Sequence, residues 1–185
     1  MQAPEDPSDA WLLQAVARKE ESALEALYTR WAPRLTYVMR AAGVSEDDVP
    51  DLLQTVFLEI WSKAHRFQPS RGGAAGWMFQ LARSRTIDFL RRQHRRAEPL
   101  NEDHPDPAPG EGEQAEQLSL HGALATLTPR ERAVLELAYF GGFSLREISV
   151  AWGVPLGSVK TWGHRGLQKL RRIFGTESEK RKAPP

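Results

Sequence analysis

The chain has 185 residues, of which 41% are hydrophobic and 26% charged, with a net charge of +1 and no cysteine. This length suits one domain or two small ones, and the lack of cysteine excludes disulfides, thiolate metal sites and thiol-based sensing by this chain. No apolar run approaches the roughly 18 residues of a membrane-spanning helix. The first ten residues, MQAPEDPSDA, are acidic and contain proline, unlike a signal peptide. We therefore expect a soluble, cytoplasmic protein.

Hydrophobic spacing predicts two helices near the start of the chain. Residues 1–8 are polar and are expected to be disordered. Asp9 is the expected N-cap of a short helix over 9–16, and a strongly periodic helix follows over 24–39. Pro33 lies inside this second helix, where a proline can bend the axis.

The most regular amphipathic helix is predicted over 49–64. Ser45 and Asp48 offer a start that resembles a capping box. Periodicity identifies the buried side of this helix, but it does not say whether the polar side is merely solvated or binds a partner. The next segment, 65–76, is rich in Gly and Pro and is predicted to be a loop. The apolar positions of the helix are Val49, Leu52, Leu53, Val56, Phe57, Ile60, Trp61 and Ala64.

The segment 77–96 combines aromatic rings with strong positive charge. It contains six Arg and one Asp, and more apolar residues than one helical stripe needs. Ring faces can stack on unpaired bases while cations neutralise phosphates, so this predicted helix suits single-stranded nucleic acid. The alternative is that Trp77, Phe79 and Phe89 are core residues.

Residues 97–118 have the composition of a linker. Pro, Gly and acids dominate, and residues 97–120 contain seven acids and no Lys or Arg. The linker divides the chain into an N-terminal helical domain, 9–96, and a C-terminal one, 119–175. Because no strand signal reaches useful strength, the predicted fold class is all-α: two small helical domains joined by a flexible acidic linker.

Two capping boxes mark helix starts in the C-terminal domain. Thr128 and Glu131 stand three residues apart, as do Ser144 and Glu147. The helix that follows the first box ends at Gly141-Gly142. The second box opens the short first helix of a predicted helix-turn-helix.

The second helix of this motif is predicted from about 156–158 to Phe174, after a break at Gly153. Its polar side offers hydroxyls, amides and cations with no acid, which suits the DNA major groove. An ordinary solvated basic face is the alternative. The tail after Phe174 is expected to be disordered. The polar side consists of Ser158, Lys160, Thr161, His164, Arg165, Gln168, Lys169, Arg171 and Arg172.

Nothing in the sequence points to catalysis, a cofactor or a metal. The five His residues do not fall into metal-ligand spacing, and the loop RGGAAG lacks the Lys-Ser/Thr ending of a phosphate-binding loop. Catalytic triads are recognised in space, so sequence alone does not exclude one. We expect a protein that is not an enzyme and needs no cofactor.

Taken together, four segments resemble the extracytoplasmic-function (ECF) sigma factors, the smallest two-domain bacterial sigma factors. Residues 23–35, ALEALYTRWAPRL, resemble the first conserved helix of the family. Residues 48–67, DVPDLLQTVFLEIWSKAHRF, resemble the helix that grips the β′ clamp helices of RNA polymerase. Residues 76–96, GWMFQLARSRTIDFLRRQHRR, resemble the helix that reads and opens the −10 promoter element. Residues 127–172, LTPRERAVLELAYFGGFSLREISVAWGVPLGSVKTWGHRGLQKLRR, resemble the domain that binds the −35 element.

The resemblance implies a transcription initiation factor whose partners are core RNA polymerase, promoter DNA and an inhibitory anti-sigma factor. It also implies roles for matching positions. The polymerase-binding residues would be Asp51, Gln54 and Glu59. The −10-binding residues would be Arg66, Phe67, Arg71, Trp77, Ser84, Asp88, Arg91 and Arg92, with Ser84 and Asp88 at a flipped-out base. The −35-binding residues would be Lys160, Thr161, His164, Arg165 and Gln168.

Some positions depart from the family pattern. Ser84 stands where many members have Asn, Trp162 replaces an Arg, and Gly163 replaces a larger apolar residue. Two rival functions are a helix-turn-helix regulator that acts without polymerase and a pure protein-interaction module, such as an antagonist of a sigma factor. The Arg-rich aromatic helix argues against the first, and the basic recognition face argues against the second.

Overall fold

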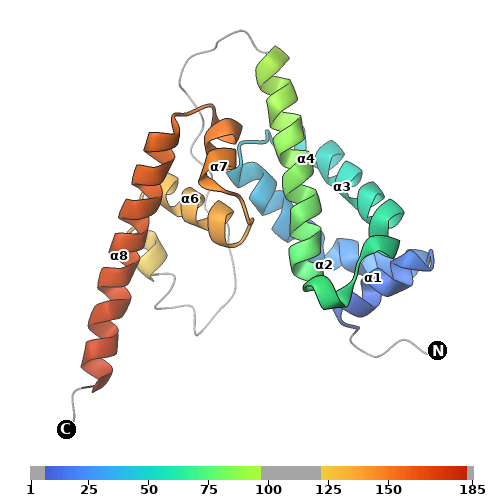
Figure 1. Cartoon of the computed structure of the whole chain (residues 1–185), viewed down its shortest axis with the longest axis horizontal. Coiled ribbons are helices and arrows are strands. Elements are labelled where there is room, and N and C mark those ends of the chain that lie inside the picture. Colours follow the sequence, from blue (N-terminus) through green and yellow to red (C-terminus); the bar gives the residue numbers. More distant parts are fainter. Residues whose placement is uncertain (1–6, 97–121, 183–185) are drawn as a thin grey trace. The chain divides into compact units, whose positions relative to one another are not determined.

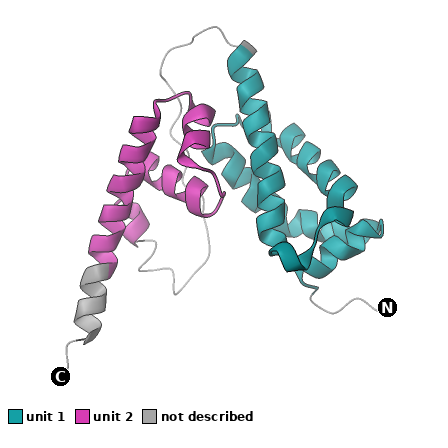
Figure 2. Ribbon diagram, in the orientation of Figure 1, with its two compact units in different colours: residues 1–100 teal, residues 101–185 magenta. Residues whose placement is uncertain are grey.

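The computed structural model describes residues 7–96 and 122–182, with side chains described for 7–95 and 122–174. These ranges are helical and contain no strand, which confirms the all-α fold class. The chain divides into two compact units, residues 1–100 and 101–185 (Figures 1 and 2). The predicted linker, 97–118, and nearly all of the predicted disordered start, 1–8, lie outside the described residues.

The N-terminal unit is built from helices that share one apolar core. The α3 and α4 helices pack along each other, and α2 contacts α1, α3 and α4 (Figure 1). Among the described helices of the chain, none is both long and apolar enough to cross a membrane. The helices are α1 (Asp9–Ala17), α2 (Glu21–Ala41), α3 (Val49–Lys63) and α4 (Ala74–Arg96), and fully buried core side chains include Leu12, Leu13, Leu27, Leu35, Met39, Ile60, Met78 and Leu90.

Three details of this unit differ from the sequence-based expectation. The N-cap of α1 is Ser8 rather than Asp9, because the Ser8 hydroxyl accepts a hydrogen bond from the backbone N–H of Trp11 at 3.3 Å. Asp48 is the N-cap residue of α3, but no side chain caps the helix; the Ser45 hydroxyl instead accepts a hydrogen bond from the backbone N–H of Asp48. The predicted loop is shorter than expected, because 3-10 turns form at Ala64–Arg66 and Pro69–Arg71 and α4 already begins at Ala74.

The C-terminal unit contains the predicted helix-turn-helix. Residues 122–125 are helical and are followed by α6 (Pro129–Tyr139), α7 (Leu145–Trp152) and α8 (Leu156–Lys182). Both predicted capping boxes are confirmed, at the starts of α6 and α7. Gly153 ends α7 in the left-handed conformation, with φ of 64°, which glycine adopts without steric cost.

The end of α8 corrects the expectation of a disordered tail after Phe174. The helix continues to Lys182. One Gly costs a helix only about 1 kcal/mol relative to Ala. The residues after Gly175 include Glu, Lys and Arg, which favour helix, and the first proline comes after Lys182.

Two glycines allow α8 to lie close to α6. Both Gly163 and Gly166 are buried. A Cβ added at Gly163 would lie 3.3 Å from Cγ1 of Val134, and one added at Gly166 would lie 3.0 Å from Cδ1 of Leu135. The small residues therefore set the helix separation, and a larger side chain there would push α8 outward.

We predict that Gly163→Leu destabilises the C-terminal unit, because the added side chain overpacks the contact with Val134; overpacking costs about 1–3 kcal/mol. The measurement is the unfolding midpoint followed by circular dichroism. Gly157→Ala is the matched control, since a Cβ there meets nothing within 4 Å. It should leave the midpoint unchanged or raise it through helix propensity. A stable Gly163→Leu variant would contradict the close packing.

Candidate nucleic-acid interface

The α8 helix separates a buried side from an exposed polar side. Val159, Gly163 and Gly166 are buried against the rest of the unit. The hydroxyl of Thr161 donates to the carbonyl of Gly157 at 2.9 Å, which leaves its oxygen able to accept a further hydrogen bond. All of the predicted −35 residues lie on the exposed side: Lys160, Thr161, His164, Arg165 and Gln168.

Lys169 does not belong to this exposed side, although the sequence pattern placed it there. Its Nζ lies 2.6 Å from Oε2 of Glu131, a carboxylate on α6 whose side chain is only 5% exposed. Burial raises the pKa of Glu131. The hydrogen bonds from Lys169 and from the backbone of Thr128 outweigh burial, so this pKa lies below its ordinary value. Lys169 is therefore a structural partner of a buried acid.

Two tryptophans and an arginine form a cluster between α6, α7 and α8. Arg130 of α6 lies over the ring of Trp152 at 5.3 Å and over the ring of Trp162 at 5.8 Å. The two indole rings are 6.1 Å apart. Such cation–π contacts join α6, α7 and α8. Sequence reasoning noted that Trp162 departs from the family pattern but did not find its partners.

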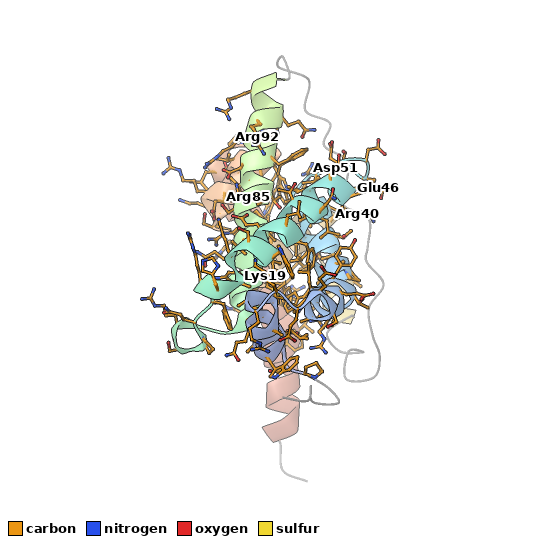
Figure 3. The ribbon with its side chains drawn as sticks, turned by 90° about the vertical axis from the view of Figure 1, so that its right-hand side faces the viewer. Lys19, Arg40, Glu46, Asp51, Arg85 and Arg92 are labelled. Atoms are coloured by element: carbon orange, nitrogen blue, oxygen red, sulfur yellow. The ribbon has the colours of Figure 1, made fainter. Side chains whose placement is uncertain are left out.

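On α4, the predicted −10 residues recur every three or four positions along one side. Ser84, Arg91 and Arg92 are exposed, and the side chain of Asp88 is 44% exposed. Figure 3 shows Arg85 and Arg92 along this helix. Helical spacing thus brings a hydroxyl, a carboxylate and two guanidinium groups to one surface.

The aromatic residues near the start of α4 are more buried than expected. Phe67 is only 8% exposed, and its ring centroid lies 5.9 Å from that of Trp77, which is half-buried. Phe67 therefore packs inside the unit, against Trp77, and does not offer a free ring face for base stacking. Arg66 and Arg71 are exposed on the same loop.

The α3 helix presents a second surface. Asp51 and Gln54 are exposed, as predicted for residues that face a partner. Leu58 is 61% exposed and continues their row. In the sequence, Leu58 is an apolar residue that lies outside the buried positions of the helix. Figure 3 shows Asp51 on α3.

The Glu59 side chain is mostly covered within its own unit. Its side chain is 9% exposed and pairs with Arg85 of α4 and with Lys63. Hydrogen bonding from Arg85 is the main cause that lowers the pKa of Glu59 to about 2, against the opposing effect of burial. The ion pair joins α3 to α4, so Glu59 has a structural role inside the unit, and the polymerase contact expected for it stays a prediction.

Across the described residues, no group of three or more His, Asp or Glu side chains lies close enough to hold a metal ion. The α4 and α8 surfaces offer cations, hydroxyls and the Asp88 carboxylate, which can bind phosphates and base edges.

Comparisons with known proteins follow the same division. Residues 27–96 match the family described as Sigma-70 region 2, and residues 117–170 match Sigma-70, region 4. The chain is 34% identical over 167 residues to the ECF RNA polymerase sigma factor RpoE of Cereibacter sphaeroides, a match that covers 87% of this chain and 92% of that protein. It is 31% identical to the RNA polymerase sigma factor CarQ of Myxococcus xanthus, over 84% of this chain and 91% of that one.

Among solved structures, the chain resembles Rhodobacter sphaeroides SigE in complex with the anti-sigma ChrR. The sequence identity is 29%, the TM-score is 0.46, and the alignment covers 89% of this chain and 97% of that one.

We predict that Glu59→Gln lowers the free energy of unfolding at pH 7 by about 3 kcal/mol, because Arg85 loses a charged partner that is mostly covered by the fold. The pKa of Glu59 is lowered from 4.5 to about 2, so ionised Glu59 stabilises the fold above pH 4.5. That contribution disappears as the pH falls from 4.5 toward 2.

The measurement is urea unfolding of both proteins across this pH range. The difference between them should narrow on acidification. Glu46→Gln serves as the control, since Glu46 is 78% exposed and should change little. A difference that stays constant with pH would contradict the role of the ion pair.

Proposed function

The chain belongs to the extracytoplasmic-function (ECF) RNA polymerase sigma factors, and on this basis we propose how its residues divide the work of promoter recognition. A sigma factor directs core RNA polymerase to promoter DNA and performs no bond-forming chemistry itself. The observation that carries the proposal is that α4 and α8 each bury one side and expose the polar side whose residues match the family's DNA contacts. We further propose that the protein acts in the cytoplasm, together with polymerase.

The N-terminal unit is proposed to bind polymerase through α3 and the −10 element through α4. Asp51, Gln54 and Leu58 form the exposed row on α3. Non-template bases leave the stack at a cost of a few kcal/mol, and the protein must offset this cost with contacts to the flipped base. Ser84 and Asp88 are the proposed base contacts. The cations Arg66, Arg71, Arg91 and Arg92 are proposed to neutralise phosphates, with Trp77 at the edge of the site.

The C-terminal unit is proposed to hold the −35 duplex with the exposed side of α8. Lys160 and Arg165 supply cations, while Thr161, His164 and Gln168 supply groups that can read base edges or bind phosphate oxygens. The domain bounds proposed from the sequence are 9–96 and 119–175. A tether between two DNA-binding units raises the effective concentration of the second once the first is bound.

An anti-sigma factor is proposed as the inhibitory partner, as the family resemblance implies. Each unit offers exposed apolar side chains that such a partner could cover. Leu58 is 61% exposed in the N-terminal unit, and Tyr139 and Phe140 are 67% and 64% exposed in the C-terminal unit.

The direct test mixes the purified full-length protein with core RNA polymerase on a sizing column and then assays run-off transcription from the DNA upstream of its own gene. Co-elution with promoter-specific transcripts is expected. Duplex DNA binding by the protein alone, without polymerase binding, would favour the regulator.

We predict that Lys160→Ala and Arg165→Ala each weaken promoter binding by the holoenzyme by about tenfold. Loss of a phosphate contact should also reduce, by about one, the slope of the logarithm of the binding constant against the logarithm of the salt concentration, because one fewer counterion is released. The measurement is promoter affinity between 50 and 200 mM salt, a range in which phosphate contacts act strongly. Arg40→Ala removes an exposed charge from the other unit and is the control. Equal losses in all three variants would argue against a specific −35 role.

We predict that Leu58→Glu weakens binding to core polymerase by about tenfold or more, because a charge replaces an exposed apolar contact. Leu58→Met keeps the volume and apolar character and should retain binding. Affinity is measured with labelled sigma factor and core enzyme in the absence of DNA. Full binding by Leu58→Glu would remove this residue from the proposed surface.

A further inference from the structure

One arginine connects the two proposed surfaces of the N-terminal unit. Arg85 of α4 donates from Nη2 to Oε1 of Glu59 at 2.6 Å and from Nε to the other carboxylate oxygen. Its Nη1 lies 3.7 Å from Oδ2 of Asp88, one turn along α4. The same guanidinium therefore hydrogen-bonds a mostly covered acid on α3 and forms a longer ion pair with a half-exposed acid on α4.

The geometry of a guanidinium makes this arrangement directional. Its donors lie in one plane in a fixed fork, so two hydrogen bonds to a carboxylate fix the orientation of the whole group. Glu59 is 9% exposed and is also held by Lys63, so the fork has a rigid anchor. Because Nε and Nη2 of Arg85 are bound to Glu59, the remaining nitrogen, Nη1, is directed toward Asp88.

Asp88 is the side chain that this arrangement would orient. Its side chain is 44% exposed and follows Ser84 by one helical turn. An ionised carboxylate only accepts hydrogen bonds, so it distinguishes bases by the N–H groups that they present to it. A carboxylate held in one place discriminates more sharply than one that rotates freely, since fewer competing geometries remain.

We propose that Arg85 is a positioning residue for −10 base selection: anchored by Glu59, it holds the Asp88 carboxylate where the captured base is read. This inference rests on the proposed role of Asp88 in base recognition. On this proposal α3 has two functions. Its exposed row of Asp51, Gln54 and Leu58 faces polymerase, and its Glu59 holds Arg85 on the base-reading side of α4.

The test is a selection of −10 sequences from a randomised promoter pool by holoenzyme assembled from full-length protein and core polymerase. The readout is the relative preference among the four bases at each −10 position. Asp88→Ala should change the preference at one position by about tenfold, the scale of one good hydrogen-bonded base contact. Arg85→Ala and Glu59→Gln should reduce the preference at that same position by about threefold or more and leave the other positions unchanged.

Two further variants separate positioning from general stability. Arg85→Lys keeps the charge but lacks the planar fork, so it should behave like Arg85→Ala. Arg40→Ala removes an exposed cation that pairs with Glu46 and is a partner of neither Glu59 nor Asp88, and it should leave base preference unchanged. In the double variant Arg85→Ala/Asp88→Ala, the effect of Arg85→Ala on base preference should vanish.

Each outcome has a separate meaning. If Asp88→Ala leaves every base preference intact, the proposed role of Asp88 in −10 reading fails. If Asp88→Ala changes the preference but Arg85→Ala lowers occupancy of all sequences equally, Arg85 only stabilises the fold and the positioning role is refuted. An effect of Arg85→Ala that persists in the double variant also refutes it.

Discussion

The ion pair between Glu59 and Arg85 joins α3 to α4 beside their apolar contacts. A carboxylate that is 9% exposed is costly unless a cation and hydrogen bonds compensate for its lost hydration, and the fork of Arg85 supplies both. The pair fixes the facing sides of the two helices. The outward side of α3, with its acid, amide and leucine, and the outward side of α4, with its arginines, are the surfaces that remain for partners.

The C-terminal unit follows the same constraint with different residues. Glu131 is buried at the start of α6, where it completes a capping box and pairs with Lys169 of α8. Gly163 and Gly166 allow the two helices to approach. The position of α8 therefore depends on the buried carboxylate of Glu131 and on two glycines, Gly163 and Gly166. The polar residues on the other side of α8 are exposed.

The proposed binding surfaces consist of side chains on α3, α4 and α8 that are not used in packing within each unit. Two residues that the resemblance placed at partners, Glu59 and Phe67, are mostly covered within their own unit. Lys169, which the pattern placed on the polar side of α8, pairs with Glu131. Leu58 shows the opposite case: it is apolar, but packing leaves it exposed on the side of α3 that carries Asp51. Polymerase and DNA would thus meet side chains whose backbone is already fixed by interior contacts, which limits the entropy lost on binding.

The sequence alone determined the main helices but not all of their ends, together with the capping boxes at Thr128 and Ser144, the helix-turn-helix and the family. These features depend on local hydrogen bonding and on spacing along the chain. It could not decide the role of residues at the border between the buried and exposed sides of a helix. Glu59 and Lys169 sit at such borders, and there the exposure of a side chain depends on which neighbouring helix supplies a partner. Only the tertiary structure brings Arg85 to Glu59 and Glu131 to Lys169, because those partners are far apart in the sequence and no local pattern encodes their meeting.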